Sequence, residues 1–458
     1  MADLSAGPAP KPAISLFVTP AQVRKRHRQG TALRYFGLAA ISLVLFFLAV
    51  LLFSIVSRGL PALWQYQAQI ELLYDPEILT PDEGEATSET VSRVSLRSGF
   101  ERGIFAGSMR RTLEGAGIDT AEFADGDLSE LIFAANRRDL RDRVAANLNL
   151  IGTTETVNIP IALTVTRYLS GELSGEGRAQ MPPGIEEPQL RLIDAMVEAG
   201  LIERGFRWAF FSNVYSQSGE VAGIGPALMG SLYMTLVVLV FSLIFGGAAS
   251  IYLEEFAPKN RLTDFIEINI SNLAAVPSIV YGILGAAILF TLTDLGFGNS
   301  IRGTALLGGI VLSLMTLPTI VIATRAALKG VPPSIRDAAL GVGASKMQTT
   351  FHHVLPLAAP GILTGTIIGI AQALGETAPL LLIGLSVSTG AELLSSPLNG
   401  GLLEQTQSMP TVVYLFAQNE DAPVREGLAQ SAILVMLLLL FALNILAIFL
   451  RRKFERRW

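Results

Sequence analysis

Long apolar runs, separated by shorter polar stretches, dominate the chain. A helix needs ~20 consecutive apolar residues to cross a bilayer. Runs of about this length lie near 34–57, 226–253, 264–291, 303–328, 357–386 and 429–450. The pattern predicts an all-α polytopic membrane protein with six transmembrane helices and one long insertion between the first two.

Composition agrees with a membrane protein and narrows its chemistry. Half of the residues are hydrophobic and only 16% are charged, whereas ordinary soluble domains carry about 25% charged residues. The net charge of −5 is small and does not favour a nucleic-acid partner. The chain has no Cys and three His, which excludes disulfides and argues against a His-based metal site. We therefore expect no catalytic residue, no metal and no cofactor.

Positive charge near the span ends predicts the orientation in the membrane. The N-terminal stretch holds six cations, which are Lys11, Arg24, Lys25, Arg26, Arg28 and Arg34. The segment 451–458 holds five, whereas the loops assigned to the other side hold only Arg302 and Arg425. Both termini are therefore expected in the cytoplasm. The first run begins too late and is too long for a cleaved signal peptide, so we interpret it as a signal anchor after a disordered basic tail.

The insertion at 58–225 is expected to form a separate domain. Between 59 and 220 it contains 25 acidic residues, 14 Arg and no Lys, so its net charge is −11. Apolar residues recur at helical spacing in 120–150 and in 186–205, and 158–169 alternates weakly like a strand. We predict a helix-rich α+β domain on the periplasmic side. The alternative is a partly disordered loop.

A mostly polar segment at 336–361 separates two of the spans. Pro332 and Pro333 are expected to end the fourth span, and Ser334 to cap a new short helix with Asp337 as the capping-box acid. Small residues at Ala338 and Ala339 would give that helix a flat face.

Glycines then permit a turn at Gly341 and Gly343, before a second short helix over 344–354. Leu355 and Pro356 are expected to end this second helix before the fifth span.

The segment resembles the EAA loop of ABC importer permeases, in which E-A-A is followed by Gly and later by Leu-Pro at fixed spacing. Asp337 stands for the Glu of that pattern, and His353 stands where Ile is usual. The resemblance implies a cytoplasmic loop at 334–356 that couples to an ATPase. Its residues would be Arg336, Asp337, Ala338, Ala339, Gly343, Leu355 and Pro356. The alternative is an amphipathic interfacial helix.

The fifth span carries a glycine stripe and one acid. Gly361, Gly365 and Gly369 are four residues apart and share a helix face, which predicts close packing. Glu376 is the carboxylate placed well inside an apolar run, and such residues usually face a cavity or a partner. Gly375 and Pro379, on either side, would unwind the helix. A structural Glu paired with a neighbouring helix stays open as a second interpretation.

The stretches "GETAPLL", "AAVPSIVYGILG", "LPTIVIATRAALKGVP" and "QSMPTVVY" resemble phosphate importer permeases of the PstA type over about 205–458. In that family an Arg often stands four residues before the Glu of G-E-T, whereas this chain has Gln372. The implied translocation path comprises Arg325, Gln372, Gly375, Glu376, Thr377 and Pro379.

The resemblance implies a multi-pass permease subunit of an ATP-driven phosphate importer in a bacterial inner membrane. ATP hydrolysis would take place on another chain, since no Walker motif occurs here. The implied partners are a homologous second permease subunit, two ATP-binding subunits, a periplasmic phosphate-binding protein and membrane lipid.

The expected organisation is a tail at 1–33, a transmembrane helix at 34–57, a periplasmic domain at 58–225, a permease core with five transmembrane helices at 226–450, and a basic tail at 451–458. The alternatives are an importer for another solute such as sulfate, molybdate or a peptide, a gated channel, and a membrane sensor with a periplasmic domain.

Overall fold

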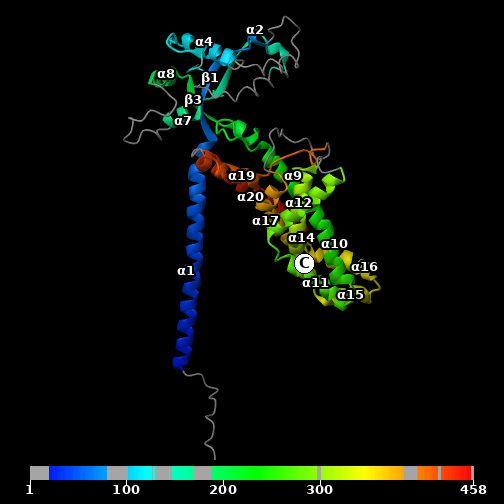
Figure 1. The fold of residues 1–458 in the computed structure, drawn as a ribbon. Coiled ribbons are helices and arrows are strands. Elements are labelled where there is room, and N and C mark those ends of the chain that lie inside the picture. The colour runs from blue at the N-terminus through cyan, green and yellow to red at the C-terminus, as the bar shows by residue number, and fades with distance from the viewer. Residues whose placement is uncertain are drawn as a thin grey trace, which may run out of the picture. The chain divides into compact units, whose positions relative to one another are not determined.

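The computed structural model describes residues 20–79, 102–125, 127–128, 144, 147–169, 187–296, 301–385, 400–420 and 424–454. The chain divides into two units, Met1–Ser57 and Arg58–Trp458. The first unit consists largely of α1 (Pro20–Gly59), a single helix of 40 residues (Figure 1). Residues 20–33 are therefore helical, which corrects the expected disordered tail over that stretch. Pro20 suits the first turn of a helix, and the Arg, Lys, Gln and Ala that follow are good helix formers. The rest of the expected tail lies outside the described residues.

A three-stranded antiparallel sheet organises the described part of the segment between α1 and the next long helix. The strands are β1 (Trp64–Leu73), β2 (Thr154–Pro160) and β3 (Ile202–Phe206), in the order β2-β1-β3. Helices α2 (Pro76–Leu79), α4 (Gly107–Gly115), α7 (Leu163–Leu169) and α8 (Glu187–Glu198) accompany it. We call this part the α/β domain. Its core takes alternate residues of β1 together with one face of α4 and one of α8, namely Ala68, Ile70, Leu72, Met109, Leu113, Leu192, Ile193 and Met196.

Two expectations for the α/β domain need correction. The strand expected over 158–169 ends at Pro160, and 163–169 is helical instead. Proline cannot donate to a strand ladder, and Val165 is buried in the domain core. The helix expected over 186–205 ends at Glu198, because Gly200 adopts a φ of +72° and the chain then enters β3. Most of the helix expected over 120–150 lies outside the described residues.

Long helices form the remainder of the second unit. α9 (Gly225–Phe241) continues through η6 (Ser242–Gly246), α10 (Gly247–Ile251) and η7 (Tyr252–Phe256). α14 (Ala305–Lys329), α17 (Leu355–Leu374), α19 (Met409–Ala417) and α20 (Ala429–Phe454) follow, with the turn η10 (Val424–Leu428) leading into α20. Within the described residues, five helices are long and apolar enough to cross a membrane, or up to six if one bent pair counts as a span.

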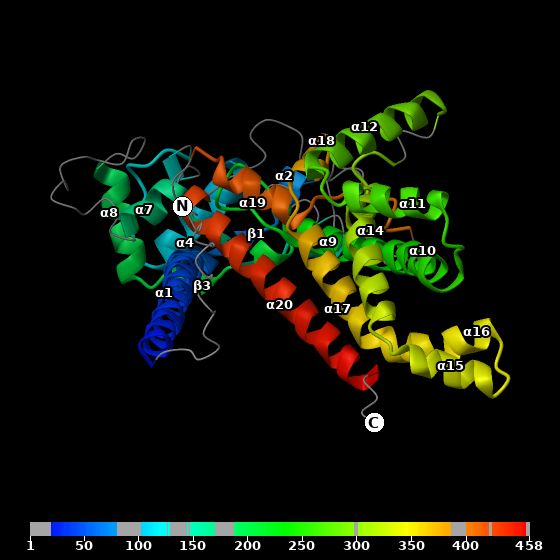
Figure 2. The same ribbon diagram turned by 90° about the horizontal axis from the view of Figure 1, so that it is seen from below.

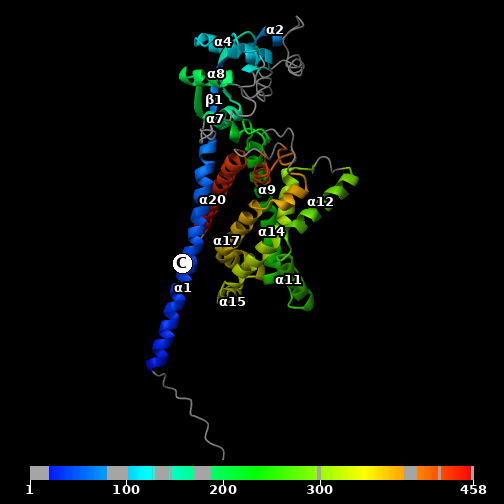
Figure 3. The same ribbon diagram turned by 60° about the vertical axis from the view of Figure 1, so that its left-hand side comes forward.

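The glycine stripe of α17 packs against α14. A Cβ at Gly361 would come 2.6 Å from the Cβ of Ala327, and a Cβ at Gly365 would clash with Ala323. Gly369 faces Ile320 of the same helix. Glycine lets two helix backbones approach this closely. The predicted close-packing role of the stripe is confirmed, and α9, α14 and α17 lie side by side (Figure 3).

The third expected span is not one helix. α11 (Arg261–Leu273) and α12 (Ser278–Asp294) are bent by 102° at the break between them. Pro277 stands at the N-cap of α12 with extended ψ. Proline lacks the N–H that would continue α11 and disfavours helical geometry in the residue before it. The single span expected over 264–291 is therefore wrong as a straight helix.

The fifth expected span also differs from the prediction. It begins before residue 357 as part of one helix over Lys346–Leu374. It ends at Leu374, and α18 (Ala378–Leu382) follows after three residues. The predicted unwinding beside Gly375 is therefore present.

Candidate functional site

The first half of the EAA-like loop, residues 334–356, is built on α15 (Pro333–Gly341). Pro332 is the N-cap residue and no side chain caps the helix, so Ser334 lies inside the first turn. The expected capping role of Ser334 with Asp337 is wrong, because proline at the cap and first position starts the helix on its own. Asp337 and Ala338 are exposed.

Only one of the two alanines expected to form a flat face on α15 is exposed to a partner. Ala339 is 5% exposed, whereas Ala338 points to solvent. Gly343 then turns the chain with a φ of +94°, and a Cβ there would meet nothing within 4 Å. Backbone conformation alone therefore demands glycine at this position. Gly341 is in the helix and has equally open surroundings.

The second half of the loop is continuous with a long helix. Ser345 caps α16 (Lys346–Gln348) through a reciprocal capping box with Gln348. The π-helix η8 (Thr349–Val354) leads directly into α17, so Leu355 and Pro356 do not end the helix as expected. A proline ring clashes with the carbonyl four residues earlier. The wider π turn immediately upstream relieves such a clash.

Figure 2 shows α15 and α16 together beyond the ends of α14 and α17. Apolar contacts seat the loop there. Val354 and Leu355 pack with Leu328 and Val331 at the end of α14, and Ile335 of α15 packs against the same cluster. The loop is therefore fixed to the ends of two long helices.

Arg336 is the main polar connection of α15. Its guanidinium donates to the Glu255 carboxylate, with Nη2 2.7 Å from Oε1, and to the carbonyls of Leu328 and Val331 at 2.9 and 2.8 Å. The Glu255 side chain is 8% exposed. Arg336 therefore satisfies carbonyls at the C-terminal end of α14 and ties α15 to η7.

A second cluster surrounds Arg325 on α14. Nε lies 3.3 Å from Glu254 Oε2, and Nη2 lies 2.6 Å from Glu267 Oε1 on α11. Lys329 adds a contact of 3.6 Å to Glu254. Two cations thus face two carboxylates. No ion pair joins Arg325 to Glu376 in the part of the chain that the structure describes.

Sequence reasoning missed Glu254, Glu255 and Glu267. The signal for the first two is a pair of adjacent acids at the end of an apolar run, 225–256. Acids at such a position need cations within reach, but the sequence alone offers several candidates. Figures 1 and 3 show α11 and α15 at the same end of the helix bundle, which is how these pairs form.

The break between α17 and α18 holds the other predicted residues. Glu376 is half-buried, and its carboxylate makes no hydrogen bond or ion pair within the described residues. Thr377 is the N-cap residue of α18, and Gln372 is exposed. Pro379 is buried against α12, where a Cβ at Gly282 would come 2.6 Å from its Cα. The tight contact with α12 fixes the direction in which the chain leaves the break.

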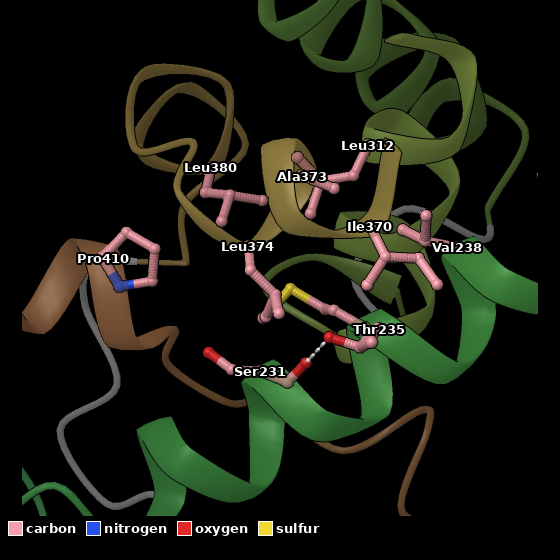
Figure 4. A pocket seen from close by; sticks show the side chains of 10 residues that line it. Ser231, Thr235, Val238, Leu312, Ile370, Ala373, Leu374, Leu380 and Pro410 are labelled. Carbon is pink, nitrogen blue, oxygen red and sulfur yellow. Dashed lines mark hydrogen bonds between the residues drawn. The ribbon is translucent and has the colours of Figure 1, made fainter. Parts of the chain in front are cut away.

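A pocket lies beside this break (Figure 4). Its lining comes from α9, α14, α17, α18 and α19, namely Ser231, Met234, Thr235, Val238, Leu312, Ile370, Ala373, Leu374, Leu380 and Pro410. Ser231 Oγ accepts from the N–H of Met409 at 2.8 Å, and Thr235 Oγ1 donates to the Ser231 carbonyl at 2.7 Å. Gln372, Glu376 and Thr377 do not line the pocket. The pocket is mostly apolar and its two hydroxyls are already engaged.

No cluster of three or more His, Asp or Glu that could hold a metal ion occurs among the residues that the structure describes. Three carboxylates lie near one another at this end of the bundle, and each already pairs with an arginine. They are Glu254, Glu255 and Glu267.

Comparison with known proteins identifies two regions. Residues 243–458 match the family described as binding-protein-dependent transport system inner membrane component. Residues 20–178 match a domain of unknown function, DUF3333. This second match covers α1 and a large part of the α/β domain.

Several relatives share about a third of their matched residues with this chain. The phosphate transport system permease protein PstA of Yersinia pestis is 32% identical over 50% of this chain and 74% of its own length. PstA 1 of Mycobacterium tuberculosis is 31% identical over 51% and 72%. The probable ABC transporter permease protein YqgI of Bacillus subtilis is 32% identical over 40% and 60%, so the chain spans less than two thirds of that relative.

Among solved structures, an inward-facing MetNI methionine ABC transporter covers 50% of this chain and 95% of its own at 19% identity. Its TM-score of 0.38 is too low to establish a shared fold. The sequence matches to the transport family and to the PstA proteins carry the assignment. The chain belongs to the PstA-type permeases, which are inner membrane subunits of binding-protein-dependent ABC transporters and not enzymes.

Proposed function

We propose that this permease subunit forms half of the translocation path of an ATP-driven phosphate importer. The relatives named as phosphate permeases support the solute. The "GETAPLL" stretch at the α17 break is the local feature that resembles phosphate permeases. The complete importer would contain a second homologous permease subunit, two ATP-binding subunits and a periplasmic phosphate-binding protein.

The proposed topology places both termini and the EAA-like loop in the cytoplasm, and the α/β domain at 58–225 in the periplasm. The last turn of α20 carries Arg451, Arg452 and Lys453, and the N-terminal stretch is equally basic. Such charge stays on the cytoplasmic side of an inner membrane. The boundaries that we propose are those expected from the sequence, with 226–450 as the permease core and 334–356 as its coupling loop.

The observation that carries the coupling proposal is the double attachment of the loop. Its first helix is tied through Arg336 to Glu255, at the end of the helix that starts at Gly225. Its second helix is continuous with α17, which ends at Leu374, two residues before Glu376. A displacement of the loop by an ATPase would therefore move two membrane helices together, one of which ends at the proposed path.

The loop also presents an apolar surface for such a partner. Large hydrophobic side chains on it are exposed, namely Leu340 at 49%, Val342 at 86%, Met347 at 57% and Phe351 at 46%. Contiguous exposed apolar side chains mark protein interaction sites. With Asp337 and Ala338 beside them, they form the docking face that we propose for the ATP-binding subunit.

The proposed path uses the break after α17. The side chains of Gln372 and Thr377 are donors that would meet a phosphate there without adding a cation. The expected backbone donors are engaged in this structure, because the N–H groups of Gly375 and Glu376 donate to the carbonyls of Gln372 and Ala373, each at 3.2 Å. Arg325 is engaged by two carboxylates in this structure. It would contribute to the path only if a conformational change released it. Weak contacts suit a path that must let its solute leave, whereas tight recognition would belong to the separate binding protein.

Reconstitution tests the proposal. A tagged chain is expressed with its genomic neighbours, purified, and placed in vesicles with ATP inside. We expect an ATP-binding subunit to co-purify and labelled phosphate to enter in preference to sulfate and molybdate. Assembly with an ATPase but preferential uptake of another anion would overturn the solute assignment and leave the permease assignment intact.

A further inference from the structure

Exposed aromatic side chains gather where the α/β domain joins the long helices. Among the described residues between 60 and 224, four large hydrophobic side chains are exposed, namely Leu60, Trp64, Val197 and Trp208. Trp208 is 76% exposed and Trp64 is 39% exposed. Three of the four lie near the junction and not on the outer helices of the domain.

The two indoles belong to one aromatic ladder. The ring of Phe206 lies edge-on between them, with centroids 5.2 Å from Trp64 and 4.6 Å from Trp208. Trp64 and Phe206 are also paired across β1 and β3. The ladder is therefore held by the sheet, and Trp208 continues it beyond the end of β3.

The neighbouring backbone holds Trp208 in this outward position. Arg207 turns inward and donates to the carbonyls of Gly219 and Ala222, and its burial lowers its pKa to about 10. On the other side, Phe210 is fully buried with Leu63, Ala227 and residues of α19 and α20. Trp208 begins the short helix η5 (Trp208–Phe211) between these two buried anchors. The buried residues on both sides of Trp208 therefore fix the backbone so that the Trp208 side chain stays exposed.

The ladder also lies at the junction where the chain passes from the apolar helix α1 to the sheet. Trp64 follows the last residue of α1, Gly59, by five positions. The buried partners of Phe210 include Ala227 in the first turn of α9 and Phe416 at the end of α19. Two exposed arginines lie close to this junction. Arg204 donates to the Pro61 carbonyl at 3.3 Å, and Arg58 forms an exposed ion pair of 3.7 Å with Glu426.

We propose that Trp64 and Trp208 anchor the base of the α/β domain in the headgroup layer of the bilayer, on the side where α1 ends at Gly59. Indole rings favour this layer because their apolar face meets acyl chains while the N–H meets water or phosphate oxygens. Neither indole N–H donates a hydrogen bond within the described residues. The adjacent Arg204 and Arg58 suit lipid phosphates. The inference needs the chain to span a membrane but does not depend on the solute.

Fluorescence quenching on the full chain tests the anchor. The sequence has three Trp, at 64, 208 and 458, so Trp458→Phe leaves only the two indoles of the ladder. The variant is reconstituted into phosphatidylcholine vesicles whose acyl chains are brominated either near the glycerol or near the terminal methyl. We expect the bromine near the glycerol to quench more strongly than the deep bromine, as for an interfacial belt.

A matched control places an indole elsewhere on the same domain. Val197 on α8 is 43% exposed and lies five positions before Ile202, which begins β3 at the opposite end of the strand from Phe206. Val197→Trp, combined with Phe at 64, 208 and 458, should be quenched freely by aqueous iodide and by neither brominated lipid. Should that combination not fold, iodide and bromine quenching of Trp458→Phe against free N-acetyltryptophanamide gives the same comparison.

Three results would contradict the anchor. Iodide quenching of Trp458→Phe as strong as that of the control, without lipid quenching, would place the ladder in water. Stronger quenching by the deep bromine would place it in the hydrocarbon core. Protection from iodide that appears only when partner subunits are added, again without lipid quenching, would assign the ladder to a protein interface.

Discussion

Arg336 on α15 and Glu255 on η7 form a short ion pair, with 2.7 Å between Nη2 and Oε1, although 81 positions separate them in the chain. The pair is largely shielded from water, with side-chain exposures of 23% and 8%. The same guanidinium also binds two carbonyls at the end of α14. A loop residue that resembles part of a docking motif is thus turned inward and holds the loop to the helices.

Loss of this pair should damage both stability and coupling. Arg336→Ala leaves the Glu255 carboxylate shielded and without its partner, which costs about 3 kcal/mol in comparable buried pairs. We expect a lower melting temperature in detergent and loss of phosphate uptake. Arg336→Lys keeps the charge but not the fork that reaches two carbonyls, so an intermediate effect is expected.

Arg452, which is exposed near the end of α20, provides the matched control. Arg452→Ala should change stability by no more than about 0.5 kcal/mol, as for most surface substitutions. A melting temperature for Arg336→Ala equal to that of Arg452→Ala would show that the ion pair does not support the loop.

Gly343 and Gly341 offer a comparison in which only backbone conformation differs. Both have open space where a Cβ would go, but Gly343 has a φ of +94°. Gly343→Asp should strain the turn by ~1 kcal/mol or more and reorient the two halves of the loop. We expect the chain to stay in the membrane, with uptake abolished and the ATPase subunit bound more weakly.

The paired variant Gly341→Asp lies in α15 and requires no such strain. Co-purification of the ATPase and uptake are measured for both. Equal loss of ATPase binding in the two variants would point to the added charge and not to the turn. Normal phosphate uptake in Gly343→Asp would show that the turn at Gly343 has no role in coupling.

Glu376 is expected to act through shape and hydrogen bonding at the break after α17. The described part of the chain supplies no cation to its carboxylate, so removal of the charge alone should be mild. Glu376→Gln should keep assembly and most of the transport, within about threefold, which is under 1 kcal/mol. Glu376→Leu should assemble but not transport, because it removes the polar atoms as well.

Uptake rates for both variants, normalised to assembled complex, decide this question. Failure of Glu376→Gln in an intact complex would mean that the carboxylate holds a cation from another chain. Normal transport by Glu376→Leu would exclude Glu376 from the path.

A structural role of Arg325 in ion pairing can be distinguished from a direct role in phosphate binding. Arg325→Gln leaves Glu254 with Lys329 alone, and leaves Glu267 without a cation among the described residues. We expect a loss of about 2 kcal/mol, less than for a fully buried pair because Glu267 is partly exposed. The double variant Arg325→Gln/Glu267→Gln removes one charge of each sign and should recover part of the melting temperature and of the transport. Recovery of stability without any transport would assign Arg325 to the path itself.

Several features of this protein follow from local sequence alone. Apolar runs long enough for a bilayer predict most of the long helices, because backbone groups in lipid must be paired within the segment. Glycines at 361, 365 and 369 predict a packing face, since helical periodicity places them on one side. Gly375 and Pro379 predict the break after Leu374, because both residues act on the backbone where they stand.

Other features depend on contacts that sequence spacing does not encode. The same kind of proline reasoning failed at Pro356, where a π turn upstream lets the helix continue. At Pro277 the sequence analysis expected an uninterrupted span, whereas the chain bends by 102° between α11 and α12. Proline indicates a disturbance, but the packing around it decides between a bulge, a bend and an end. Strands β1 and β3 likewise depend on each other for their hydrogen bonds.

Tertiary structure also decided the partners of the charged residues. Sequence reasoning treated Arg325 as a donor for the path and Arg336 as part of a docking surface. The fold instead brings Glu254, Glu255 and Glu267 to them from other helices. A charge at the end of an apolar helix must find an opposite charge or water, so its existence predicts a partner. Which partner it finds is set by the way in which the helices pack, and helix packing depends on contacts between residues far apart in the chain.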